Sequence, residues 1–272
     1  MVDLANSRLE ALDPFFRFLN YFDSPYFSFV LIPIVWLGYS YKWGLRLFYW
    51  IVANSLLIGV AKHLVGWPRP STDMPEIGLF HPHSFGFPSG GAQTAMFLGS
   101  LLIFYWRTPI AWIVGVTYIL LISFSRLYLG VHYPIDVLGG WCIGLILLAL
   151  FVFCEKPLEM WLAKKTLPFL LLLSLIPPLV MLYFFPSTKY TAGSLIGVGL
   201  GTYFSLKHHL FLPQPKNLAE GAGRSAIGIA MLFLMVFLIP GKDTFLQSFI
   251  SGLFMSLAAS PICKWFVEKK RM

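Results

Sequence analysis

Long apolar runs, separated by short charged or turn-rich segments, repeat along the chain. An apolar run of about 20 residues is long enough to cross a bilayer as one helix. The pattern therefore predicts an all-α fold, a polytopic membrane bundle of about nine helices. The predicted spans are residues 25–41, 44–66, 88–106, 109–130, 134–154, 166–185, 191–212, 225–241 and 245–266.

The first 24 residues have a different pattern. Leu9, Leu12, Phe16 and Leu19 recur at intervals of three and four, which is the spacing of one helix face. This predicts an amphipathic segment at the membrane interface over residues 1–24. The segment lacks a basic start, an uninterrupted apolar core and a small-residue cleavage site, so we do not expect a signal peptide.

Charged residues between 155 and 165 mark a predicted boundary. Residues 25–155 then form a membrane core, and residues 156–272 form a C-terminal extension of four helices. The extension has almost no charge inside its spans, which favours a packing role over a second functional site.

Composition supports the membrane interpretation, because 57% of the 272 residues are hydrophobic and only 12% are charged, with a mean hydropathy of +0.73. The net charge of +8 does not indicate nucleic-acid binding, since the basic residues lie mostly in short loops. Suppose that the loop at 67–87 faces the exterior. Of the basic residues that do not belong to the motifs, thirteen then lie on the cytoplasmic side and four lie on the exterior side, namely Arg8, Arg17, Lys189 and Lys242. This imbalance predicts an outside amino terminus and a cytoplasmic carboxyl terminus.

Three polar blocks fall at one predicted membrane face. The last contains Arg126, His132 and Asp136, where an imidazole four residues before a carboxylate follows an arginine. In this arrangement His132 is a candidate nucleophile, Asp136 fixes its tautomer, and Arg126 binds phosphate.

The two upstream blocks add phosphate-binding groups. Lys62 precedes Arg69 by seven residues, and both supply permanent positive charge. Ser89, Gly90 and Gly91 follow Pro88 at the start of an apolar run, so their backbone NH groups should lie at the positive end of a helix. Together the blocks predict a phosphoryl-transfer site, and we expect no cofactor.

The segments Lys62 to Pro70, Pro88 to Gly91 and Ser125 to Asp136 resemble the motifs of the phosphatidic acid phosphatase type 2 superfamily, which includes vanadium haloperoxidases. These motifs are Lys-x6-Arg-Pro, Pro-Ser-Gly-His and Ser-Arg-x5-His-x3-Asp, and the resemblance covers roughly residues 20 to 155. It implies a metal-independent phosphatase with a five-helix core. It also implies His132 as the nucleophile and Lys62, Arg69, Ser89, Gly90 and Arg126 as phosphate ligands.

One motif position departs from the family, because Gly91 stands where the family has a histidine that protonates the leaving group or supports the phosphate. Three explanations are open. His81 or His83 from the adjoining loop replaces it as the acid, the leaving group is itself a phosphate that needs little protonation, or turnover is weak or absent.

The sequence therefore predicts an integral-membrane phosphatase for a lipid phosphate or polyprenyl diphosphate. One alternative is a lipid phosphotransferase that uses the same site, and another is a catalytically silent lipid-binding or transport protein. We expect a bacterial cytoplasmic membrane with the site facing the periplasm or exterior, although a luminal site in the endoplasmic reticulum fits the same charge rule. The expected partners are the lipid substrate and the bilayer, without nucleic acid.

Overall fold

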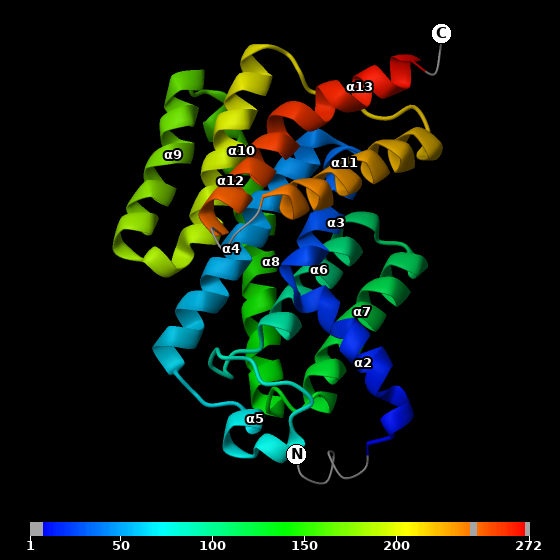
Figure 1. The fold of residues 1–272 in the computed structure, drawn as a ribbon, viewed down its shortest axis with the longest axis vertical. Helices are drawn as coiled ribbons and strands as arrows, with labels where there is room; N and C mark the ends of the chain where they lie inside the picture. The colour runs from blue at the N-terminus through cyan, green and yellow to red at the C-terminus, as the bar shows by residue number, and fades with distance from the viewer. Residues whose placement is uncertain (1–7, 240–243, 270–272) are drawn as a thin grey trace. The chain divides into compact units, whose positions relative to one another are not determined.

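A computed structural model describes residues 8–239 and 244–269, which form helices and connecting segments with no strand among them, confirming the all-α prediction. Figure 1 shows the order of these helices along the chain. The α-helices are α2 (Asp13–Leu19), α3 (Pro25–Trp36), α4 (Tyr41–Val65), α5 (Pro70–Asp73), α6 (Gly90–Trp106), α7 (Pro109–Tyr128), α8 (Pro134–Ala163), α9 (Leu167–Phe184), α10 (Lys189–Lys207), α11 (Leu218–Leu238), α12 (Thr244–Leu253) and α13 (Ala259–Lys269). The shorter turns are η1 (Glu10–Leu12), η2 (Asn20–Asp23), η3 (Pro75–Ile77), η4 (Pro186–Thr188) and the π turn η5 (Phe254–Ala258).

Six helices in the described part of the chain are long and apolar enough to cross a membrane, or seven if one bent pair counts as a span. The six are α4, α7, α8, α9, α11 and residues 244–265 of α12–α13. Nine spans are therefore not confirmed. Helices exist at the other three predicted positions, but α3 has 12 residues, α6 has 17, and α10 contains several glycine and hydroxyl residues. The chain is an integral membrane protein.

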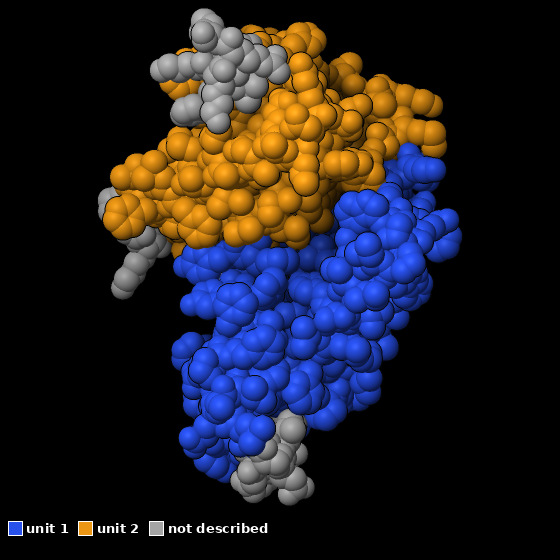
Figure 2. All heavy atoms as spheres, turned by 90° about the vertical axis from the view of Figure 1, so that its right-hand side faces the viewer, with its two compact units in different colours: residues 1–27, 50–157 blue, residues 28–49, 158–272 orange. Residues whose placement is uncertain are grey.

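The chain divides into two compact units, coloured separately in Figure 2. Unit 1 comprises Met1–Phe27 and Trp50–Pro157, and unit 2 comprises Ser28–Tyr49 and Leu158–Met272. The predicted boundaries at 24 and 155 remain predictions, and the units group residues 28–49 with the C-terminal part instead. Residues 1–7, 240–243 and 270–272, which include Lys242, Lys270 and Arg271 of the charge count, lie outside the described residues.

In unit 1, α6 packs against α7 where two glycines meet. A Cβ atom on Gly99 would lie 2.8 Å from the carbonyl oxygen of Gly115, so only glycine permits this separation of the two helices. The amphipathic segment forms η1, α2 and η2, and its residues Phe16 and Leu19 are buried in a cluster with Tyr128. The rings of Phe16 and Tyr128 stack with centroids 4.0 Å apart. Part of the apolar face of this segment is therefore covered by protein.

In unit 2, α10 packs along α12 through small residues. Cβ atoms built on Gly193 and Gly197 would collide with the backbone of Phe245 and Phe249, and one on Gly201 would collide with Ser256. Close approach of the helix backbones explains this stripe of glycines.

Candidate active site

The first motif places its two cations through backbone contacts. Lys62 lies in the last turn of α4, and its Nζ donates to the carbonyl oxygens of Phe85 at 2.5 Å and Gly86 at 3.2 Å. Arg69 precedes α5, and its Nε and Nη2 donate to the carbonyl and hydroxyl oxygens of Ser84 at 2.6 and 2.9 Å. Both side chains are buried, so these acceptors fix their directions and offset part of their desolvation.

The second motif forms the amino terminus of α6. Ser89 is the N-cap, and its hydroxyl oxygen accepts from the backbone NH of Ala92 at 3.4 Å. The helix begins at Gly90, two residues after Pro88, so Pro88 does not occupy the expected first helical position. Gly90 and Gly91 are instead the first two helical residues, and their NH groups lie at the positive end of the helix dipole, as expected.

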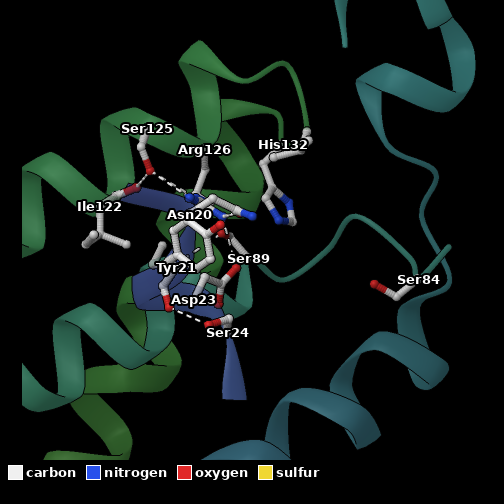
Figure 3. Close-up of polar contacts among 12 residues, drawn as sticks. Asn20, Tyr21, Asp23, Ser24, Ser84, Ser89, Ile122, Ser125, Arg126 and His132 are labelled. Atoms are coloured by element: carbon white, nitrogen blue, oxygen red, sulfur yellow. Dashed lines mark hydrogen bonds and ion pairs between the residues drawn. The ribbon is translucent and has the colours of Figure 1, made fainter. Parts of the chain in front are cut away.

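Arg126 of the third motif lies in the last turn of α7 and is 1% exposed. Its Nε and Nη2 donate to the Ser125 hydroxyl at 3.1 and 2.9 Å. Its Nη1 donates to Asn20 Oδ1 at 2.7 Å and to Asp23 Oδ2 at 3.1 Å (Figure 3). Asn20 and Asp23 belong to η2, so the amino-terminal segment contributes directly to this arginine site.

His132 lies between α7 and α8, just after a turn in which Gly130 has a φ of 69°. The backbone there is left-handed, a conformation that glycine adopts without a steric penalty. Arg69 Nη1 lies 3.0 Å from His132 Nε2, and Asp136 Oδ2 lies 3.3 Å from His132 Nδ1. A guanidinium is only a donor, so Nε2 must carry the lone pair and Nδ1 the proton.

The protonation state of His132 follows from its surroundings. Burial, together with the charges of Arg69 and Lys62, lowers the pKa of His132 to about 3, although the hydrogen bond to Asp136 opposes the shift. The imidazole is therefore neutral at physiological pH. Asp136 Oδ2 also accepts from the backbone NH of Tyr133 at 2.8 Å, which holds the carboxylate in place.

Direct contacts join the three motifs within unit 1. Arg69 reaches His132, and the backbone NH of Ser89 donates to the carbonyl oxygen of Asp136 at 2.9 Å. Figure 3 shows Ser89, Arg126 and His132 converging from separate elements. The structure therefore brings the predicted residues of all three blocks to one place, with Gly91 beside Arg126.

The two loop histidines lie in a more open environment. His81 and His83 are both exposed, and His81 Nε2 lies 3.1 Å from the carbonyl oxygen of Pro75. Among the described residues, no group of three or more His, Cys, Asp or Glu side chains is arranged to hold a metal ion.

Sequence reasoning missed three residues at the site: Asn20 and Asp23, which contact Arg126, and Ser84, which contacts Arg69. The amino-terminal segment was interpreted from its apolar spacing alone, which does not say what its polar residues meet. One signal was present, because a glycine in place of the motif histidine leaves space that another group must fill.

Residues 43–158 match the family model described as the PAP2 superfamily. The chain is 30% identical over 123 residues to an undecaprenyl-diphosphatase of Sulfolobus acidocaldarius, covering 43% of this chain and 59% of that protein. It is 31% identical over 135 residues to phosphatidylglycerophosphatase B of Bacillus subtilis, covering 44% and 64%. It is 26% identical over 263 residues to lipid phosphate phosphatase delta of Arabidopsis thaliana, covering 83% and 62%.

The matches span about 60% of the length of these relatives. A solved structure, that of a transmembrane PAP2-type phosphatidylglycerolphosphate phosphatase from Bacillus subtilis, matches with a TM-score of 0.49 and 26% identity over 57% of this chain and 82% of that one. The family model covers all three polar blocks. The segment 43–158, which carries these blocks, is similar to the PAP2 superfamily.

Proposed function

We propose that this protein is a membrane phosphatase that hydrolyses a lipid phosphate or polyprenyl diphosphate through a phosphohistidine intermediate on His132. The supporting observation is the orientation of this imidazole, whose unprotonated Nε2 lies against Arg69 while Nδ1 faces Asp136. A nucleophile next to a phosphate-binding cation, with its tautomer fixed by a carboxylate, is the arrangement that phosphoryl transfer requires.

Substrate binding uses the three cations and the helix terminus. Lys62, Arg69 and Arg126 supply positive charge for the phosphoryl oxygens, and the first NH groups of α6 add oriented dipoles. Because these donors are held by protein contacts before substrate arrives, little reorganisation is needed as charge moves in the transition state.

In the first chemical step, the Nε2 lone pair of His132 attacks phosphorus and forms an N–P bond. The bond between phosphorus and the leaving-group oxygen breaks, its electron pair stays on that oxygen, and the oxygen takes a proton. Asp136 stabilises the imidazolium character that develops on the ring through its hydrogen bond to Nδ1.

In the second step, water attacks phosphorus and loses a proton, the N–P bond breaks, and neutral His132 and inorganic phosphate are released. The net reaction adds one water to the substrate. A phosphomonoester yields a lipid alcohol, and a lipid diphosphate yields a lipid monophosphate.

A lipid substrate is supported by the membrane setting and by the relatives, whose names state activity on undecaprenyl diphosphate, phosphatidylglycerophosphate and lipid phosphates. The loop charge imbalance supports a site on the exterior face of a cytoplasmic membrane, with the carboxyl terminus inside. A substrate at that boundary keeps its tail in the bilayer while its headgroup reaches the cations.

The test measures phosphate release from phosphatidic acid and from undecaprenyl diphosphate by purified protein in detergent with a chelator. His132→Ala should lower the rate by about 10,000-fold, because the nucleophile is lost. His63→Ala is the matched control, since His63 is exposed and, among the contacts described for it, its ring meets only the carbonyl oxygen of Gly59 and the edge of the Phe85 ring. That variant should stay within about 3-fold of wild type.

Equal release by wild type and His132→Ala would overturn the proposed nucleophile. Release that needs an added alcohol acceptor would favour the phosphotransferase, and no release from either protein would favour the silent lipid-binding alternative. Labelling with a radioactive phosphoryl group should give a base-stable, acid-labile adduct that is absent in His132→Ala.

A further inference from the structure

The position that lacks the motif histidine is filled from another part of the chain. A Cβ atom built on Gly91 would lie 2.9 Å from Cγ and 3.0 Å from Oδ2 of Asp23, and 3.1 Å from Cδ of Arg126. Separations this short require the neighbours to move, and the nearest neighbour is a carboxyl group. The Asp23 carboxyl therefore occupies the space into which a side chain at position 91 would extend.

Asp23 is held there by a packed segment. It ends η2, and the preceding helix α2 is anchored by buried Phe16, which stacks on Tyr128. Asp13 in the same helix accepts a hydrogen bond from the Tyr128 hydroxyl at 2.7 Å. These contacts tie the segment to the end of α7, so the approach of Asp23 to Arg126 is built into the fold.

The carboxyl also lies in the electrostatic environment of the site. Arg126 contacts it directly, and the charges of Arg69 and Lys62 act on it as well. Tyr118 of α7 is the other titratable group that interacts with it. The Asp23 side chain is 29% exposed, compared with 1% for Arg126, so it is open to exchange of protons and to a leaving group.

We propose that Asp23 is the acid that protonates the leaving-group oxygen, in the place of the motif histidine that Gly91 lacks. This inference rests on the proposed function, because it supplies the proton that the first chemical step needs.

Substrate binding gives the carboxyl its proton. Burial raises the pKa of the Asp23 carboxyl, whereas the charges of Arg126, Arg69 and Lys62 oppose that shift. In the free protein the ionised form pairs with Arg126. A bound phosphoryl group accepts hydrogen bonds from Arg126 in place of Asp23, and it brings negative charge next to the Asp23 carboxyl. Because the two negative charges repel, the protonated form of Asp23 is then favoured. The proton comes from water.

The transfer of this proton is coupled to the bond changes at phosphorus. As the N–P bond to His132 forms and the bond from phosphorus to the leaving oxygen breaks, Asp23 transfers its proton to that oxygen and becomes a carboxylate. In the second step the carboxylate accepts a proton from the attacking water. One residue thus serves as acid and then as base. When inorganic phosphate leaves, Asp23 releases this proton to the solvent and pairs with Arg126 again, which restores its starting state.

The test is Asp23→Asn, assayed with two leaving groups. The amide still accepts a hydrogen bond from Arg126 but cannot donate a proton as an acid, so geometry is preserved and acid catalysis is lost. With phosphatidic acid, whose alkoxide is a poor leaving group, the turnover number should fall by about 100- to 10,000-fold. With p-nitrophenyl phosphate, whose phenolate leaves unprotonated, it should fall by less than about 10-fold.

The matched control is Asp13→Asn, which removes a carboxylate from the same segment without touching Arg126. Any loss in this variant should be equal for the two substrates, because it acts through packing of the segment. An exchange variant, Asp23→Ala with Gly91→His, should regain a large part of the activity on phosphatidic acid, whereas Gly91→His alone should be inactive because the imidazole has no room.

The inference is overturned if Asp23→Asn loses equal activity on both substrates, which is the pattern of a positioning role, or if it loses none. The same assay includes wild type and His132→Ala. If wild type releases phosphate and His132→Ala does not, the proposed function stands whatever Asp23→Asn does, and if His132→Ala matches wild type, the proposed function itself fails.

Discussion

The two compact units bury polar side chains in different ways. In unit 2 the described buried polar residues are six serines and one arginine, namely Ser205, Arg224, Ser225, Ser248, Ser251, Ser256 and Ser260. Several of these serines donate to a carbonyl oxygen three or four residues earlier, as Ser225 does to Gly221 at 2.9 Å and Ser251 does to Gln247 at 2.8 Å. Arg224 is paired with Glu220 one helical turn away at 2.5 Å. Most of these groups are satisfied within one helix and serve packing, whereas Ser205 donates to the carbonyl oxygen of Ser256, 51 residues away.

Unit 1 buries charged and titratable groups whose partners are distant in sequence. Arg69 contacts His132, 63 residues away, and Arg126 contacts Asn20, 106 residues away. Such contacts cost desolvation and chain entropy without the close packing that apolar residues provide. Buried polarity satisfied within one helix thus indicates structure, whereas buried charge satisfied across distant segments indicates a site. Four variants and conditions test this difference, from the largest expected effect to the smallest.

Replacing Asp136 with Asn should have the largest effect. The amide can present its NH2 group to Nδ1, which favours the tautomer with the proton on Nε2 and removes the attacking lone pair. We expect the turnover number to fall by about 1,000- to 10,000-fold with little change in thermal stability. Asp73→Asn is the control, because Asp73 is a carboxylate that accepts from the exposed Tyr133 hydroxyl at 2.9 Å. Equal losses in the two variants would contradict the role of Asp136.

Arg69→Lys keeps the charge but loses the planar fork that reaches Ser84, Val131 and His132 together. Misplacement of the cation should lower kcat/KM by about 100-fold. In unit 2, Arg46→Lys changes an arginine that pairs with Glu159 at 2.6 Å and should change kcat/KM by less than about 2-fold. Steady-state kinetics measure kcat/KM for both variants. Similar values of kcat/KM in the two would mean that the guanidinium fork at position 69 is not needed.

A pair of helix caps gives a smaller and more specific comparison. Ser89 caps α6 and Asn217 caps α11, each through a side-chain oxygen that accepts a backbone NH. Changing either to Ala should lower stability by about 1 kcal/mol, seen as a lower melting temperature in detergent. Only Ser89→Ala should also lower kcat/KM, by about 10-fold, because only that helix terminus faces the motif residues. An equal kinetic loss in Asn217→Ala would contradict the division of roles.

The smallest effect concerns pH. The pKa of His132 is lowered to about 3, so its charged form is disfavoured in the fold and protonation removes the nucleophile only near that pH. The kcat/KM value reports the free enzyme, and, once corrected for substrate ionisation, it should change by less than about 2-fold through His132 between pH 7 and pH 5. A loss centred near pH 6.5 that persists after the correction would show an imidazole with an ordinary pKa.

The hydropathy pattern predicted the ends of a helix well where turn-forming residues directly flank the apolar run. The span predicted at 109–130 corresponds to α7 (Pro109–Tyr128), whose ends are a threonine cap and a glycine turn. The span predicted at 134–154 is shorter than α8 (Pro134–Ala163), which continues through Glu155 and Lys156. Charged residues end an apolar run, but they are good helix formers, so the helix itself does not stop there.

Motif spacing placed the candidate residues at one end of neighbouring helices, because each lies where a predicted span begins or ends. It did not show that Ser84 holds Arg69 or that Asn20 holds Arg126. Those partners lie in segments whose own patterns are those of an ordinary loop and an amphipathic helix. Nothing local to Ser84 or Asn20 distinguishes them from exposed polar residues.

The sequence by itself determined the helical membrane class through composition and periodicity, and the candidate nucleophile with its cations through short spacings. The departure at Gly91 followed from the resemblance of these spacings to known motifs. Only the tertiary structure decided which imidazole nitrogen carries the lone pair and what fills the space above Gly91. Both depend on contacts between residues far apart in the chain, as with Asp23 and Arg126, which are 103 positions apart. Such contacts follow from how the packed segments meet, and no local pattern of residues encodes them.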